Sequence, residues 1–185
     1  HATHANAHEV QRMAQSKAVA GLCLTTEANL GDGIFPAVDY LAQGGRMGIG
    51  SDSHVSLSVV EELRWLEYGQ RLRDQRRNRM YRSDQPMVGR TLYDAALAGG
   101  AQAMGQAVAG LAVGQRADWL VLDGNDPYLA TAQDDAILNR WLFAGGDRQV
   151  RDVMANGQWV VRDGRHADEQ VSSRDFTRVL RELLG

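Results

Sequence analysis

Cysteine is scarce in this sequence of 185 residues, and there is no excess of basic charge. The single cysteine, Cys23, excludes a disulfide framework. The net charge of -3 provides no general basic field for nucleic acid, so we expect no nucleic-acid partner. The sequence has no signal peptide and no long uncharged apolar segment, which favours a cytoplasmic protein that does not enter a membrane.

The remaining composition is that of a globular protein. Hydrophobic residues make up 44% of the chain and charged residues 23%, values typical of a folded domain. A length of 185 residues is enough for one ordinary domain, or for a domain with a small appendage.

The first half of the chain alternates between apolar runs and helical patterns. The apolar run 18–24 predicts a strand buried on both faces. A polar, glycine-bearing loop is expected at 25–33 and a helical pattern at 37–43, and a second short strand at 46–50 leads into a long helix at 55–73. Two strand–loop–helix units in about fifty residues indicate an α/β protein with a parallel sheet or barrel.

The second half changes character. Thr91 fits the N-cap of a helix at about 92–104, and 119–123 reads as a strand. The segment 150–162 predicts a β-hairpin, because the Asn-Gly pair at its centre favours a tight type I′ turn. A terminal helix is expected at 173–184.

The segment 48–54 carries a carboxylate where a strand ends. In (β/α) barrels, a strand that ends in aspartate and breaks into a loop presents a catalytic carboxylate, and Asp52 occupies such a position. The alternative is that Asp52 or Ser53 caps the following helix.

Six arginines gather between 71 and 82, together with aspartates. A basic run of this kind could bind phosphate or nucleic acid. The favoured interpretation is a solvated helix end, where arginines are stabilised by the negative end of the helix dipole.

Several motifs, taken in order, resemble the amidohydrolase superfamily. They are HATH at 1–4, TTEANLGDGIFP at 25–36, GSDSH at 50–54, GQRADWLVLD at 114–123 and VMANG at 153–157. The resemblance covers essentially the whole chain. It implies the C-terminal part of a (β/α)8 amidohydrolase barrel followed by part of a small β-sandwich domain. The expected domains are residues 1–108 for barrel strands six to eight with their helices, 109–165 for the small β domain, and 166–185 for the C-terminal helix.

The resemblance also implies roles for two residues. Asp52 matches the aspartate that ends barrel strand eight, which touches a divalent metal, expected to be zinc, and takes a proton from the attacking water. His1 matches the histidine that ends strand six, and we expect it to be catalytic without being a metal ligand. The family's other metal ligands and its general acid are not in this chain. The chain opens on a motif with no initiator methionine, so we expect the missing N-terminal part of the same protein to supply them.

Three further residues are candidate substrate contacts. Glu27 and Asn29 lie in the segment after strand seven, on the catalytic face of the expected barrel, where each could contact substrate or brace the loop. His54 could contact substrate, orient Asp52 or pack within its loop.

Within the superfamily, the likeness is to enzymes that hydrolyse N-formimino-L-glutamate to N-formyl-L-glutamate and ammonia during histidine degradation. The resemblance implies a small-molecule substrate and a homodimer. Two alternatives stay open: a related deaminase that acts on a cyclic amidine or an aminated heterocycle, and an inactive fragment or scaffold.

Overall fold

The computed structural model describes residues 1–106 and 110–185, which divide into two compact units. One unit comprises His1–Gly110 with Asn125–Asp147, and the other comprises Leu111–Gly124 with Arg148–Gly185. The domain boundary expected between 108 and 109 lies outside the described residues. The segment 125–147, expected in the small β domain, belongs to the first unit.

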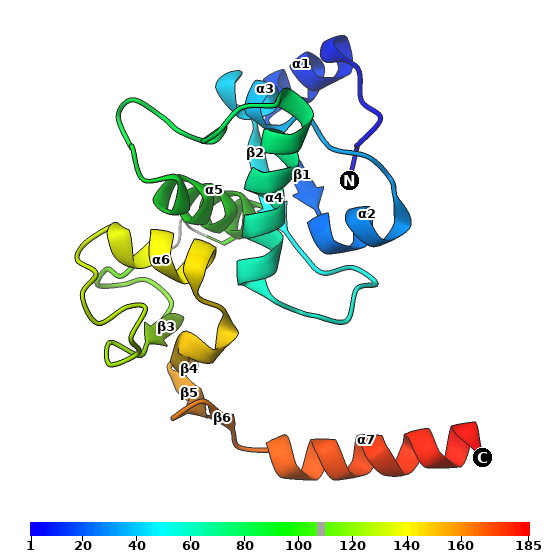
Figure 1. Ribbon diagram of the computed structural model, residues 1–185, viewed down its shortest axis with the longest axis vertical. Coiled ribbons are helices and arrows are strands. Elements are labelled where there is room, and N and C mark those ends of the chain that lie inside the picture. Colours follow the sequence, from blue (N-terminus) through cyan, green and yellow to red (C-terminus); the bar gives the residue numbers. More distant parts are fainter. Residues whose placement is uncertain (107–109) are drawn as a thin grey trace. The chain divides into compact units, whose positions relative to one another are not determined.

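The first unit is built on a pair of parallel strands with helices around them (Figure 1). Strand β1 pairs with β2 in register, so that Gly21 lies opposite Gly48. Helix α5 packs against β2, α4 packs against α2 and α6, and α1 packs against α3. The elements of this unit are α1 (Ala7–Gln15), β1 (Val19–Leu22), α2 (Leu24–Leu30), α3 (Ala37–Ala42), β2 (Arg46–Ile49), α4 (Val59–Asp74), α5 (Val88–Ala103) and α6 (Ala136–Ala144).

Local side-chain chemistry explains where these helices begin. Asn6 caps α1 through a capping box with Glu9, which satisfies otherwise unpaired N–H groups of the first turn. The Ser58 hydroxyl accepts from the Glu61 N–H and caps α4, so this helix begins at Val59 and not at residue 55. The prediction of a Thr91 cap was wrong, because α5 begins at Val88 and Thr91 lies within its first turn.

The segment after β1 also differs from its expected form. Its glycines and polar residues predicted a loop over 25–33, but Leu24–Leu30 is helical. Gly31 ends this helix in a left-handed conformation, with φ of 72°. The glycine therefore marks the end of a short helix rather than an extended loop.

The core of the first unit lies between the strand pair and the helices. Fully buried side chains come from both strands and from α3, α4, α5 and α6; the largest include Leu22, Tyr40, Met47, Leu63, Leu66, Leu92, Trp141 and Leu142. The apolar side chains of α4 are only partly buried, because Val60, Leu63 and Leu66 face the core whereas Val59 and Leu72 are exposed. Strand β1 alternates, with Ala20 and Leu22 buried and Gly21 exposed, and so is not buried on both faces among the described residues.

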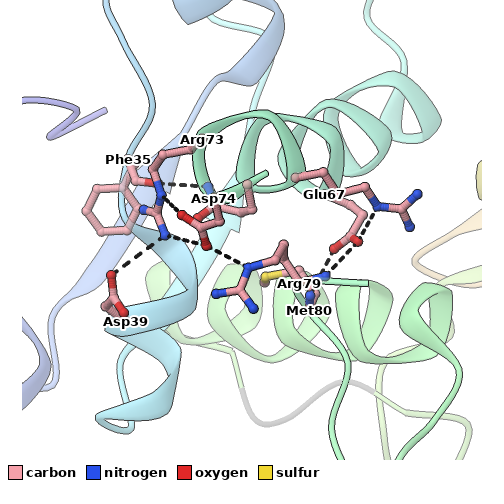
Figure 2. A network of polar contacts seen from close by, with 9 residues as sticks. Phe35, Asp39, Glu67, Arg73, Asp74, Arg79 and Met80 are labelled. Atoms are coloured by element: carbon pink, nitrogen blue, oxygen red, sulfur yellow. Dashed lines mark hydrogen bonds and ion pairs between the residues drawn. The ribbon is translucent and has the colours of Figure 1, made fainter. Parts of the chain in front are cut away.

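The arginine-rich segment is held in ion pairs (Figure 2). Arg73 and Arg79 both donate to the Asp74 carboxylate, at 2.7 and 2.6 Å. The buried Glu67 carboxylate accepts from the Arg79 and Met80 backbone N–H groups, each at 2.9 Å. These contacts fit the favoured interpretation of a solvated helix end. The ion pairs neutralise the arginine charges that would otherwise attract a phosphate group.

The second unit contains a four-stranded antiparallel sheet in the order β3-β4-β5-β6. Its elements are β3 (Trp119–Leu122), the 3-10 helix η1 (Asp147–Gln149) at its border with the first unit, β4 (Val150–Ala155), β5 (Gln158–Arg162), β6 (Arg165–His166) and α7 (Glu169–Leu184). The predicted hairpin of β4 and β5 is confirmed. Asn156 and Gly157 form its turn with φ of 50° and 78°, both in the left-handed region that a type I′ turn requires.

None of the helices within the described residues is long and apolar enough to cross a membrane.

Candidate active site

The candidate active site lies where β1 and β2 end. The two strands are parallel, so their carboxyl ends meet at one edge of the sheet. The Gly50 N–H donates to the Leu22 carbonyl at 3.0 Å and continues the pairing beyond β2. On the other side of β1, the backbone nitrogen of His1 donates to the Gly21 carbonyl. Three segments distant in sequence therefore lie side by side.

The His1 imidazole bridges two carboxylates at this edge. Its Nδ1 lies 3.1 Å from Oε1 of Glu27, and its Nε2 lies 3.2 Å from Oδ2 of Asp52. A neutral imidazole has one N–H and can donate to one carboxylate only, whereas the imidazolium can donate to both. The ring is thus oriented with one nitrogen toward a buried group and the other toward a half-exposed one.

Glu27 is the buried member of this set. Its side chain is 2% exposed, and Oε1 also accepts from the Cys23 backbone N–H at 2.9 Å. The second oxygen, Oε2, is buried and has no hydrogen-bond partner within the described residues. Burial raises the pKa of Glu27, and the bond from Cys23 opposes that rise.

Asp52 is the exposed member, with a side chain 48% accessible. It lies just beyond β2 with φ of 52°, a left-handed conformation that aspartate tolerates better than most residues. The alternative of a helix cap is excluded for both Asp52 and Ser53, because Ser58 caps the following helix. The carboxylate is therefore free to face the site.

Thr26 joins α2, which carries Glu27, to the loop that carries Asp52, a role that no sequence pattern indicated. Its hydroxyl donates to the Ser51 carbonyl at 2.7 Å and accepts from the His54 backbone N–H at 2.9 Å. One side chain from α2 thereby fixes the backbone on either side of Asp52. A threonine in a polar segment carries no pattern that would distinguish such a bridge from a surface hydroxyl.

Two further candidate substrate contacts, Asn29 and His54, flank Glu27 and Asp52 in the sequence. Asn29 is exposed on α2. The His54 ring is half-buried, and its Nδ1 lies 2.9 Å from the Ser56 hydroxyl. In the described part of the chain, no hydrogen bond joins the side chain of either residue to His1, Glu27 or Asp52. Their roles in substrate binding stay predictions.

The donor atoms at this edge suit part of a metal site. Side-chain ligand atoms of His1, Cys23 and Asp52 lie within 4.8 Å of one another. Burial, and then the charge of Asp52, raises the pKa of the Cys23 thiol, which favours its protonated form. This leaves a carboxylate and an imidazole as the stronger donors, and both are common zinc ligands.

Comparison with known proteins identifies the family. A model of the amidohydrolase family matches residues 1–160. The chain belongs to the amidohydrolase family. This result confirms the resemblance carried by the motifs at both ends of the chain.

A relative and two solved structures extend this finding. The chain is 79% identical over 184 residues to formimidoylglutamate deiminase of Pseudomonas aeruginosa, and covers 41% of that protein. It is 43% identical to an amidohydrolase from Brucella melitensis, with a TM-score of 0.93 over the whole chain and 40% of that structure. An adenosine deaminase from Xanthomonas campestris with bound zinc is 21% identical, with a TM-score of 0.84 over 98% of this chain and 41% of that one.

These structures confirm the predicted α/β class and the amidohydrolase barrel type. The chain spans about two fifths of the length of each of these proteins. The family match shows a hydrolase of the amidohydrolase type. The reaction of the whole protein is proposed below.

Proposed function

We propose that the protein of which this chain is part hydrolyses N-formimino-L-glutamate to N-formyl-L-glutamate and ammonia. The observation that carries the proposal is the meeting of His1 and Asp52, 3.2 Å apart, at the carboxyl ends of neighbouring strands. Catalytic groups of (β/α) barrels gather at this face. The 79% identity to formimidoylglutamate deiminase supports the formimino substrate.

The reaction needs one water and one proton relay. Water adds to the formimino carbon, the C=N bond becomes a single bond, and ammonia leaves as the carbonyl forms. Both protons of the water must reach the departing nitrogen, one as the water adds and one as the carbonyl forms. Asp52 is suited to accept each proton in turn and to pass it on, because its carboxylate is half-exposed and close to a second polar group. General acid–base catalysis of this kind contributes a factor of roughly 10² to 10⁴.

His1 supplies a donor beside that carboxylate. The Nε2 atom faces Asp52, so a proton taken up by Nε2 during the reaction gives an N–H beside the carboxylate that receives the water's proton. A fixed donor there stabilises the tetrahedral centre more than the planar substrate. Within this proposal His1 is catalytic without holding the metal.

Zinc is the proposed metal, and Asp52 is its proposed ligand in this chain. When bound, zinc acts as a Lewis acid and lowers the pKa of water to about 7. One carboxylate is too few for a catalytic zinc site, which needs about three protein ligands. We propose that the part of the protein preceding His1 supplies the rest, as the family resemblance implies.

The second candidate substrate is a cyclic amidine or an aminated heterocycle. The zinc-containing adenosine deaminase shares the fold at 21% identity, which gives the fold alone. The higher identity to formimidoylglutamate deiminase favours the open-chain formimino group.

Assay of the full-length protein tests both substrates and the metal. We expect stoichiometric zinc and release of ammonia from N-formimino-L-glutamate, with loss of activity on chelation and recovery on zinc addition. Ammonia from a ring amidine but not from N-formimino-L-glutamate would replace the first substrate with the second. Absence of bound metal would refute both enzymes and favour the scaffold alternative.

Three finer properties follow from the same proposal. The product chemistry fits histidine degradation, the single cysteine fits a cytoplasmic location, and the family resemblance implies a homodimer. Sedimentation of the full-length protein checks the homodimer, and a monomer at micromolar concentration would contradict it.

A further inference from the structure

The Glu27 carboxylate is out of reach of a substrate but in contact with the catalytic imidazole. Only 2% of its side chain is exposed, and its Oε1 atom lies 3.1 Å from Nδ1 of His1. The same oxygen accepts from the Cys23 N–H at 2.9 Å, so its position is fixed by the backbone that follows β1. The Glu27 carboxylate is therefore held in a fixed position, from which it contacts the His1 imidazole.

Keeping a carboxylate here has an energetic cost. A buried charge is unfavourable unless it is paired and hydrogen-bonded, and the Oε2 atom of Glu27 has no partner within the described residues. Loop bracing is already provided by Glu62, which is equally buried and accepts from the Thr25 backbone N–H and hydroxyl. Glu27 is therefore not needed as a second buried glutamate to hold the start of α2, and its contact with the His1 imidazole points to a role there.

We propose that Glu27 is a positioning residue that holds His1 with its proton on Nδ1 and its Nε2 toward Asp52, an inference that rests on the proposed function. A histidine's tautomer is set by the hydrogen bond that its other nitrogen makes. Both ring nitrogens face a carboxylate, but Asp52 is half-exposed and can accept from water instead, whereas the buried Glu27, held by the Cys23 N–H, cannot. The proton is therefore kept on Nδ1, and the ring plane is fixed. Nε2 is thereby kept at the reaction centre to exchange a proton with the water or the intermediate.

This role replaces the direct substrate contact considered for Glu27. A carboxylate in contact with substrate would need exposure, whereas that of Glu27 lies behind the imidazole. Loss of the side chain should lower kcat and leave KM nearly unchanged, because His1 acts on the transition state. Hydrogen-bond partners that orient metal-bound histidines typically contribute about 10- to 100-fold in activity, and we expect an effect of similar size for the partner of His1.

Two variants of the full-length, zinc-loaded enzyme separate the negative charge of Glu27 from its role as a hydrogen-bond acceptor. Glu27→Gln removes only the charge, and Glu27→Met removes both. In Glu27→Gln, the Cys23 N–H selects the amide oxygen for the Oε1 position, so Nδ1 keeps its acceptor. We expect Glu27→Gln to retain kcat within about 5-fold and Glu27→Met to lose about 10- to 100-fold. Loss of activity in both variants to the same extent would overturn the positioning role.

A double-mutant cycle with His1→Asn tests the coupling. If Glu27 acts through the imidazole, Glu27→Met should cost less than about 2-fold once His1 is replaced, because coupled residues are not additive. The matched control is Glu62→Met, whose effect should be the same with and without His1. An undiminished loss for Glu27→Met in the His1→Asn background would refute the proposal.

A structural readout separates this inference from the proposed function. In the ¹⁵N spectrum of histidine-labelled full-length enzyme without metal, His1 should carry its proton on Nδ1, and Glu27→Met should abolish that preference. A crystal structure of Glu27→Met should show Nε2 withdrawn from Asp52. These results would stand even if N-formimino-L-glutamate released no ammonia, whereas an unchanged ring and tautomer would overturn the inference with the substrate confirmed.

Discussion

Gly99 of α5 lies directly against the backbone of Met47 in β2. A Cβ atom added at Gly99 would lie 1.8 Å from the Met47 carbonyl oxygen and 2.4 Å from its carbonyl carbon. Glycine is thus required at this position for α5 and β2 to pack this closely. The loop that follows β2 carries Asp52.

Gly99→Ala should therefore destabilise the full-length protein strongly. The clash involves backbone atoms that no side-chain rotation can relieve, so α5 must move away from β2, at a cost of about 3 kcal/mol or more. Urea denaturation measures the effect. The matched control is Gly100→Ala, whose added Cβ meets nothing within 4 Å and which should be neutral or stabilising. Equal unfolding midpoints for the two variants would contradict this packing.

Thr26→Val should loosen the loop that presents Asp52. The substitution keeps the shape of the side chain but removes the hydroxyl shared by Ser51 and His54. Buried polar groups left without a partner cost about 1–3 kcal/mol. We expect lower stability on thermal denaturation and a lower kcat, since the carboxylate is no longer held. Thr26→Ser keeps the hydroxyl and should stay close to the wild type in both measurements; a Ser variant as impaired as the Val variant would point to packing of the methyl group instead.

Sequence patterns predicted the elements better than they predicted the contacts. The strand pair, the long helix and the hairpin follow from apolar periodicity and turn chemistry, which act within a few residues. The motifs around His1 and Asp52 placed both residues at strand ends, and the structure brings them within hydrogen-bond distance.

Contacts over longer separations were not predictable from the sequence. Glu27 follows His1 by 26 residues. Whether its side chain faces the substrate or the imidazole depends on helix α2, and the glycines of this segment predicted a loop in place of that helix. The bridge from Thr26 and the close approach at Gly99 likewise depend on how elements pack. Such contacts leave no periodic signal, because a single hydroxyl or glycine occurs equally in exposed loops.

The ion pairs of Asp74 predict how stability changes in acid. Hydrogen bonds from Arg73, and then from Arg79, lower the pKa of this carboxyl from 3.8 to about 2 in the folded protein. The folded state thus favours the carboxylate, so its contribution is fully present above pH 3.8 and is lost as the pH falls through about 2. Because solvent screens the pairs, we expect a contribution of ~1 kcal/mol. The difference in unfolding free energy between wild type and Asp74→Asn should be constant from pH 7 to pH 5 and shrink toward pH 3; a difference that grows in acid would contradict the assignment.

Asp52→Asn should separate chemistry from folding in the full-length enzyme. Asparagine adopts the left-handed conformation found at this position, with φ of 52°, as readily as aspartate, so the loop keeps its form. It cannot accept the water's proton, and we expect turnover to fall by about 10²- to 10⁴-fold at an unchanged melting temperature. Asp163→Asn is the matched control, since Asp163 is an exposed aspartate with φ of 49° in the second unit. Ammonia release should be normal in that control, and normal release from Asp52→Asn as well would refute the proton-accepting role of Asp52.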